Sequence, residues 1–187
     1  MGGVAFLTCR GGWPKAVGQP KELVLQQAPD YVDAVVEFDI SRVNGVRRDP
    51  ERVCMLMRSY ARMTASQGSY EMMLRDVAKS GLSFGRTSFL EYVAALKRLF
   101  VTDDLGAWSP NLRAKEDIRT SPTRHFVDPS IATAALGAGP GDLMGDLNTF
   151  GLVFESLCVS SQSECDVKIC VVFALEASYD SSRMRGG

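Results

Sequence analysis

The chain has little of what metal and redox sites are built from. It contains a single histidine, His125, and none of its five cysteines forms a Cys-x-x-Cys pair. Protein zinc sites take several Cys or His ligands at short, regular spacings, so no metal centre is expected. The sequence predicts free, mostly buried thiols in a reducing cytosol. They are Cys9, Cys54, Cys158, Cys165 and Cys170.

The sequence also lacks an excess of charge and a long apolar run. Its formal net charge is -1, whereas domains that hold nucleic acid by bulk electrostatics are usually strongly basic. Residues 2–7 lack the basic and apolar regions of a secretory signal. The stretch 167–177 comes nearest to a membrane span but is shorter than the ~18 residues that one needs. We therefore expect a cytoplasmic protein without a membrane partner.

Two motifs look catalytic or nucleotide-binding but lack the context that such loops need. Residues 81–85 fit a Gly-x-Ser-x-Gly pattern around Ser83, yet a nucleophile elbow follows a strand and helical periodicity precedes this one. His125 and Asp128 follow it in the wrong order for a hydrolase. Residues 137–141 fit a Gly-x-Gly-x-Gly pattern, but the strand that precedes a phosphate-binding loop is missing. The Gly-x-x-x-x-Gly-Lys-Ser/Thr loop of ATP-binding proteins does not occur either. The sequence predicts no catalytic residue, cofactor or metal ligand; a hydrolase built on Ser83 is the remote alternative.

Capping signals mark the starts of three helices. An acid followed by proline occurs at Asp49-Pro50 and Asp128-Pro129, and Ser69 can cap a third helix. Helical apolar spacing extends these signals into six segments, of which Pro29 is expected to kink or split the first. The segments are residues 21–40, 50–67, 70–79, 87–98, 129–136 and 142–158.

The apolar stripes of these helices predict the core, and glycines predict the turns. We expect turns at Asn44-Gly45 and across residues 137–141, and a short strand at 125–127. The expected inward side chains are Val53, Leu56, Met57, Tyr60, Ala61, Met72, Met73, Val77, Phe89, Leu90, Val93, Leu96, Phe100, Leu143, Leu147, Phe150, Val153, Phe154 and Leu157.

Residues 75–108 have the order of a winged helix-turn-helix. One amphipathic helix ends at Gly81, a turn follows, and a second helix runs to Arg98. Residues 99–101 are long enough for one strand and lead into an Asp-Asp-Leu-Gly turn, which gives the order helix, turn, helix and β-wing. The sequence thus predicts an α+β, predominantly helical protein. It would consist of a winged helix-turn-helix with flanking helices and a short, incomplete β element near the C-terminal end.

A DNA-binding winged helix places the first turn of its second helix in the major groove. That assigns Arg86, Thr87 and Ser88 to DNA contacts, with Lys97 and Arg98 near the phosphate backbone. Winged helices also serve as packing or protein-docking modules, so two interpretations stand side by side. Six arginines lie between residues 42 and 62. They are explained equally well by a solvent-exposed helix face and by a stripe that binds phosphates. They are Arg42, Arg47, Arg48, Arg52, Arg58 and Arg62.

Several short motifs occur in an order that carries a resemblance over about residues 5–159. They are RGGWPKA at 10–16, VEFDI at 36–40, RSYA at 58–61, the turn at 81–87, Tyr92, residues 99–108, Ser121-Pro122, RHFVDP at 124–129 and residues 151–155. In this order the chain resembles the region after the ATPase module in prokaryotic predicted ATP-binding proteins of the AAA type. That region is a C-terminal domain of unknown function with a winged-helix-like middle.

The resemblance implies Walker motifs before this region and a restriction-endonuclease-like end after it. The chain begins near the Gly-Gly-Trp-Pro segment and has no Walker motifs. It also has Thr123 at a position where proteins of that family commonly have a lysine. After Val159 the expected acidic and lysine-bearing strands do not follow, and residues 166–168 lack the second carboxylate that a metal site needs. We therefore expect a non-catalytic fragment, truncated or changed in reading frame, that contacts an AAA-type ATPase module or another protein. A winged-helix DNA-binding regulator is the alternative.

These signals divide the chain into four segments. We expect an N-terminal helical segment at 1–68, the winged-helix module at 69–110, a strand and helix packed on the same core at 111–159, and a poorly ordered or truncated tail at 160–187.

Overall fold

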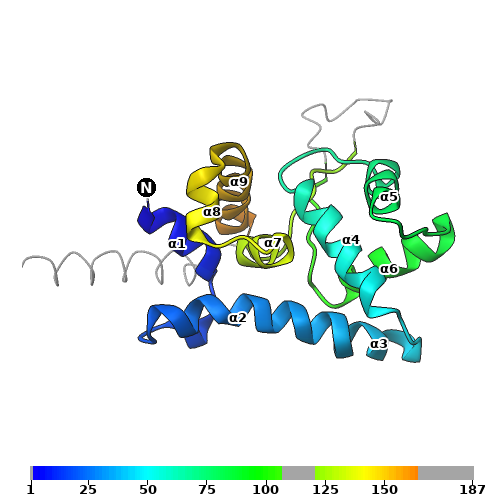
Figure 1. Ribbon diagram of the computed structural model, residues 1–187, viewed down its shortest axis with the longest axis horizontal. Helices are drawn as coiled ribbons and strands as arrows, with labels where there is room; N and C mark the ends of the chain where they lie inside the picture. The colour runs from blue at the N-terminus through cyan, green and yellow to red at the C-terminus, as the bar shows by residue number, and fades with distance from the viewer. Residues whose placement is uncertain (1, 107–120, 164–187) are drawn as a thin grey trace, which may run out of the picture.

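Two groups of helices lie on either side of α7, and a helical rod runs beneath both (Figure 1). The computed structural model describes residues 2–106 and 121–163 and is predominantly helical, as predicted. One group is α1 (Gly2–Arg10), α8 (Pro140–Gly145) and α9 (Leu147–Ser163), and the other is α4 (Pro50–Arg62), α5 (Tyr70–Lys79) and α6 (Arg86–Arg98). Helix α7 spans Pro129–Leu136. The rod joins α2 (Lys21–Ala34), a π-helical turn (Val35–Asp39) and α3 (Ile40–Arg42), and short 3-10 turns occupy Pro14–Ala16 and Val43–Gly45.

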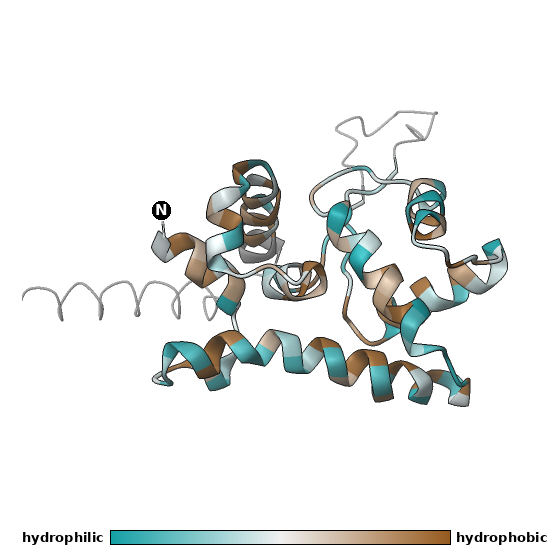
Figure 2. Ribbon diagram, viewed as in Figure 1, coloured by the Kyte–Doolittle hydropathy of each residue, from teal (hydrophilic) through white to brown (hydrophobic). Residues whose placement is uncertain are grey.

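Helix α7 joins the two groups because it is buried from several sides. Its residues from Pro129 to Thr133 are all buried, and it packs against α1, α2, α4 and α9. Figure 2 shows α7 in pale and brown tones, without a strongly hydrophilic band. A helix that is apolar all round belongs in a core. The predicted bounds 129–136 are confirmed: Asp128 accepts a hydrogen bond from the Ser130 amide at 2.8 Å, and Gly137 ends the helix with a φ of 70°.

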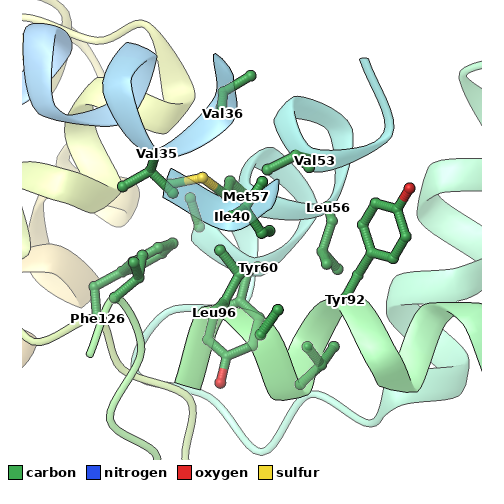
Figure 3. Close-up of a cluster of buried hydrophobic side chains, with 14 of the residues drawn as sticks. Val35, Val36, Ile40, Val53, Leu56, Met57, Tyr60, Tyr92, Leu96 and Phe126 are labelled. Carbon is green, nitrogen blue, oxygen red and sulfur yellow. The ribbon is translucent and has the colours of Figure 1, made fainter. Parts of the chain in front are cut away.

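Two apolar clusters stabilise the molecule. The larger one gathers side chains from the rod, α4, α6 and the segment before α7, including Ile40, Leu56, Leu96 and Phe126, as Figure 3 shows. The ring of Phe126 meets that of Tyr60 edge-on, with centroids 5.4 Å apart. The smaller cluster lies between α1 and α8 and is built on Ala5, Cys9 and Leu143. Within the described residues, no helix combines the length and apolarity needed to cross a membrane.

The rod shows how packing overrides a local helix breaker. Pro29 was expected to kink or split the segment, but α2 continues through it to Ala34. Val24, Ala28 and Val32, on one face of the helix, are all buried. Their burial offsets the missing amide of the proline. The irregular geometry comes later, in the π-helical turn Val35–Asp39.

A short ribbon, rather than a regular strand, follows α6. Thr102 pairs antiparallel with Phe126, and Leu105 with Thr123, while Thr64 pairs in parallel with Arg124. The strand predicted at 99–101 is wrong, because Leu99 ends the helix and the chain then reverses. The strand predicted at 125–127 is partly right, since the pairing runs over 123–126. Between residues 105 and 123, the predicted wing and Trp108 lie largely outside the described residues.

The predicted helix starts are mostly confirmed, but the helix predicted at 50–67 ends at Arg62, and three predicted boundaries between residues 137 and 163 are wrong. The side chains of Asp49 and Ser69 cap α4 and α5 as expected. The connector predicted at 137–141 is shorter, because Pro140 starts α8. The helix predicted at 142–158 is two helices, because Asp146 breaks it and its carboxylate accepts a hydrogen bond from the Thr149 amide at 3.1 Å. Residues 160–163, predicted to belong to the tail, continue α9, and the tail from 164 lies outside the described residues.

The stripes predicted the core only in part. Met73, Val77, Phe89, Val93 and Leu96 are buried, but side chains at the edges of each stripe are exposed because periodicity does not determine how wide the covered face is. The wrongly placed residues are Met72, Leu90, Phe100, Leu147 and Phe154. The thiols of Cys54 and Cys158 are also exposed, and only that of Cys9 is buried among the described cysteines, which are all free.

A buried polar network ties the ribbon to the helices. The carboxylate of Asp104, whose side chain is 5% exposed, accepts a hydrogen bond from the Tyr60 hydroxyl and ion-pairs with Arg124 at 2.5 Å and Lys97 at 2.7 Å. The Arg124 guanidinium also lies 4.3 Å from the ring centre of Tyr70. Burial and the bond to Asp104 raise the pKa of Tyr60. Burial acts to lower the pKa of Lys97, but Asp104 raises it overall. One carboxylate thus joins α4, α6 and both sides of the ribbon.

Asp104→Ala should therefore be strongly destabilising, since it leaves the Arg124 guanidinium buried without its counter-charge. We expect a loss of about 3–5 kcal/mol in the free energy of unfolding, measured by urea denaturation. Asp103→Ala is the matched control, because its side chain is exposed and the change should stay within about 0.5 kcal/mol. Equal losses in the two variants would contradict a structural role for the network.

Candidate functional site

The loop after α1 is fastened to the start of α7. The Gly12 amide donates to Asp128 Oδ2 at 2.7 Å, and Trp13 Nε1 donates to Ser130 Oγ at 2.9 Å. The other oxygen of Asp128 accepts from both the amide and the hydroxyl of Ser130. Two segments 116 residues apart in the sequence are therefore held by one carboxylate.

Gly11 is required at this junction for two reasons. Its φ is +71°, in the left-handed region that other residues avoid. A Cβ atom there would also lie 2.3 Å from Ser130 Oγ and 2.4 Å from Asp128 Oδ1. No side chain fits, so the loop approaches α7 only because residue 11 is glycine.

A cavity of about 270 Å³ opens beside this junction. We call it the Phe100 cavity, and it is lined by Gly12, Trp13, Pro14, Tyr31, Leu99, Phe100, Val127, Asp128 and Ile131. The rings of Trp13 and Tyr31 meet with centroids 5.0 Å apart. Both Asp128 oxygens are already occupied by hydrogen bonds within the chain, so the cavity presents mainly apolar and aromatic surface.

Phe100 occupies an unusual backbone position at the rim of the cavity. Its amide donates to the Lys97 carbonyl and that of Val101 to the Leu96 carbonyl, both at 3.0 Å, which is the hydrogen-bond pattern of a Schellman motif. The C′ position of this motif is usually glycine, but here Phe100 holds it with a φ of 54°. The buried pair Val101 and Leu96 fixes the turn, and the phenyl ring is left 77% exposed.

The cavity is suited to binding an apolar group rather than to chemistry. Among its lining residues only Tyr31 and Asp128 can ionise. Burial raises the pKa of Tyr31, with a smaller contribution from Asp39, so the phenol stays neutral at physiological pH. No lining side chain pairs a nucleophile with a base, as covalent catalysis would require.

The residues predicted to contact DNA lie at the two ends of α6. Arg86, Thr87 and Ser88 share its first turn, but Arg86 ion-pairs with Glu71 at 2.5 Å. At the other end Lys97 belongs to the Asp104 network. Arg98 donates to the Asn44 side chain at 2.5 Å. Each of the three cations therefore has a partner within the chain.

The six arginines between residues 42 and 62 do not form one stripe. Arg48 is buried, and its guanidinium donates to the carbonyls of Ile40, Val43 and Val46 at the end of the rod. Three others are paired with aspartates close by, and they are Arg42, Arg52 and Arg62.

The Gly-x-Ser-x-Gly segment does not form a nucleophile elbow. Ser83 is exposed in the connection between α5 and α6, with no strand before it. His125 is buried, and its Nδ1 lies 3.0 Å from the hydroxyl of a different serine, Ser156. The structure therefore places Ser83 in a helix-to-helix turn.

Residues 2–142, well over half of the 187-residue chain, match the family model of a domain of unknown function, DUF8612. The chain belongs to the DUF8612 family. No curated protein and no solved structure shows a significant match. The matched segment holds the Phe100 cavity and ends before α9. The association with an AAA-type ATPase stays a prediction, since the DUF8612 description assigns no activity.

The sequence did not predict this cavity, because the segments that line it are far apart in the chain. The RGGWP and VDP segments stood out as unusual motifs, and both line the cavity. Phe100 was assigned to the core because it continues the helical stripe of α6. The spacing of apolar residues does not show whether the Phe100 ring points into the core or, because of a positive φ at this residue, into solvent.

Gly11→Ala tests the close approach of the loop after α1 to the start of α7, beside which the cavity opens. We expect it to lower the free energy of unfolding by more than ~2 kcal/mol, because strain and overlap with Ser130 add. Gly18→Ala is the matched control: Gly18 has a φ of +76°, but no atom lies within 4 Å of the place that a Cβ would occupy, so about 1 kcal/mol of strain alone is expected. Similar losses by thermal or urea unfolding would show that the close approach is not energetically important.

Proposed function

We propose that this DUF8612 domain is a non-catalytic docking domain whose Phe100 cavity binds an apolar side chain of an AAA-type ATPase module. The observation that carries the proposal is Phe100 itself. Its aromatic ring is 77% exposed while its backbone has a φ of 54°.

The positive φ and the exposed ring of Phe100 both lower the stability of the fold. A destabilising arrangement of this kind suggests that the residue serves a function. A non-glycine residue in the left-handed region is strained by about 1–2 kcal/mol. Such strain persists where the surroundings over-determine it, and it is concentrated at binding and switch sites. An exposed aromatic ring beside an apolar hollow also has the composition of an interface hot spot. The ring would cover the partner's side chain while Trp13 and Tyr31 form the walls.

The choice of an ATPase module as partner rests on the family resemblance described above. Three of the motifs that carry it come together at the cavity: RGGWPKA supplies Trp13 and Pro14, residues 99–108 supply Phe100, and RHFVDP supplies Val127. These motifs are far apart in the chain, and the Asp128 junction brings two of them into contact. A surface built from the motifs that carry this resemblance is where we expect the ATPase module to bind.

Phe100→Ala and Phe100→Gly should both lower the affinity for the isolated ATPase module of a protein that the chain resembles. We expect at least a ten-fold loss, about 1.4 kcal/mol, by isothermal titration calorimetry. Phe100→Gly should also raise the free energy of unfolding, by up to about 1 kcal/mol, because glycine relieves the left-handed strain. Phe100→Ala should not, since alanine retains it.

Leu90→Ala is the control for this experiment, because Leu90, on α6, is an exposed apolar residue that does not line the cavity. It should leave the affinity unchanged. Binding that is equally weakened by Leu90→Ala, or that survives both Phe100 variants, would contradict docking at the cavity. Absence of any binding by the wild-type chain would remove the ATPase module as the partner.

The second candidate is a winged-helix DNA-binding regulator. The order α5, α6 and ribbon supports the winged helix predicted at 69–110, and Arg86 and Thr87 are exposed on the first turn of α6. The ion pairs of Arg86 and Lys97 and the net charge of -1 argue against strong phosphate binding. We rank it below docking for that reason.

A salt titration on duplex DNA separates the two candidates. DNA binding through α6 should weaken steeply as salt rises and should fall further with Arg86→Ala. Arg58→Ala, which removes an exposed cation from α4, is the control. The docking proposal expects no measurable binding by fluorescence anisotropy at low salt, and a steep, Arg86-dependent salt slope would favour the regulator instead.

A further inference from the structure

Helix α9 lies beyond the residues that match DUF8612 and covers part of the domain. It packs against α1, α7 and α8. Phe150 of α9 lies on the small apolar cluster that contains Cys9 and Leu143. The helix buries few side chains. Among residues 147–159 the buried ones are Val153 and Ser156, whereas Leu147 is 61% exposed.

One of the two buried side chains of α9 faces the single histidine. Nδ1 of His125, on the ribbon, lies 3.0 Å from Ser156 Oγ, and the two residues are 4% and 1% exposed. The other ring nitrogen, Nε2, is buried and has no hydrogen-bond partner among the described residues. A neutral imidazole tolerates this position. A protonated one would carry a second N–H donor, with a charge, in a place that offers it no acceptor.

We propose that α9 is a pH-sensitive cover, docked while the His125 imidazole is neutral and released when it is protonated, so that the apolar cluster around Cys9 becomes accessible. This device goes beyond the docking function and does not depend on it. Release would be local because the larger cluster under α4 and α6 contains no residue of α9.

The burial of His125 sets the direction of the pH effect. Burial lowers its pKa below the ordinary 6.5, although Glu155 on α9 and Asp104 and Asp103 on the ribbon act in the opposite sense. Helix α7 has no ionisable side chain between Pro129 and Leu136. The released state therefore binds the proton first, and docking weakens as pH falls from about 6.5 towards the lower pKa of the docked state.

Hydrogen exchange on the full chain tests the proposal. Between pH 7.5 and 5, corrected for intrinsic exchange rates, the protection of α9 amides should fall by up to about ten-fold per pH unit, while that of α4 amides stays constant. His125→Gln should make α9 protection independent of pH. Ser156→Ala should lower it about five-fold at every pH by removing one hydrogen bond.

Two further readouts separate a titrating contact from a merely structural one. Glu155→Gln removes a charge that stabilises the imidazolium in the docked state, so α9 protection should fall further at pH 5 and stay unchanged at pH 7.5. In a variant with serine at positions 54, 158, 165 and 170, thiol labelling of Cys9 relative to the unfolded chain should rise as pH falls. Normalising to the unfolded chain at each pH matters because burial raises the pKa of Cys9 to about 11.

Three results would overturn the proposal. They are α9 protection that does not change with pH, the same pH dependence in His125→Gln, and loss of α9 and α4 protection together, which would indicate global unfolding. If His125→Gln fails to fold, the larger loss of α9 protection expected for Glu155→Gln at pH 5 decides the question alone.

Discussion

The structure depends on the carboxylate of Asp128. One oxygen caps α7 through Ser130, and the other accepts the amide of Gly12 from the N-terminal loop. Because α7 is buried against both groups of helices, fixing its first turn fixes the relation between them. The interaction is possible because residue 11 is glycine, whose missing side chain lets the loop reach the helix. A charge-assisted bond to a backbone amide, partly shielded from water, is stronger than a neutral one.

The cavity follows from this junction. Trp13 is held by its bond to Ser130, so its ring stands as a wall beside Tyr31 of the rod. The end of α6 completes the rim, because the Schellman turn directs Phe100 outward while Val101 stays in the core. Three distant segments thus contribute to one apolar surface, and the strain at Phe100 is borne by the packing of its neighbours.

Several polar side chains of the domain bind other parts of the same chain. Asp104 collects Tyr60, Arg124 and Lys97, and Arg48 closes the end of the rod by binding three carbonyl groups. A cation that is held in this way has less to offer a phosphate backbone, since binding DNA would first break its internal contact. Among the described residues, the buried imidazole of His125 has one side-chain hydrogen-bond partner, Ser156, on a helix outside the family match. Protonation would therefore weaken the docking of that helix.

The sequence by itself determined the local structure: the caps at Asp49, Ser69 and Asp128, the bounds of α7 and the helical character of the chain all follow from interactions within a few residues. It could not show that Phe100 points outward, that α2 runs through Pro29 or that Asp104 is buried, because each depends on segments distant in the sequence. The cavity was beyond prediction for the same reason. Its walls meet only after the Gly12–Asp128 contact forms, and a pattern of neighbouring residues carries no information about a bond across 116 positions.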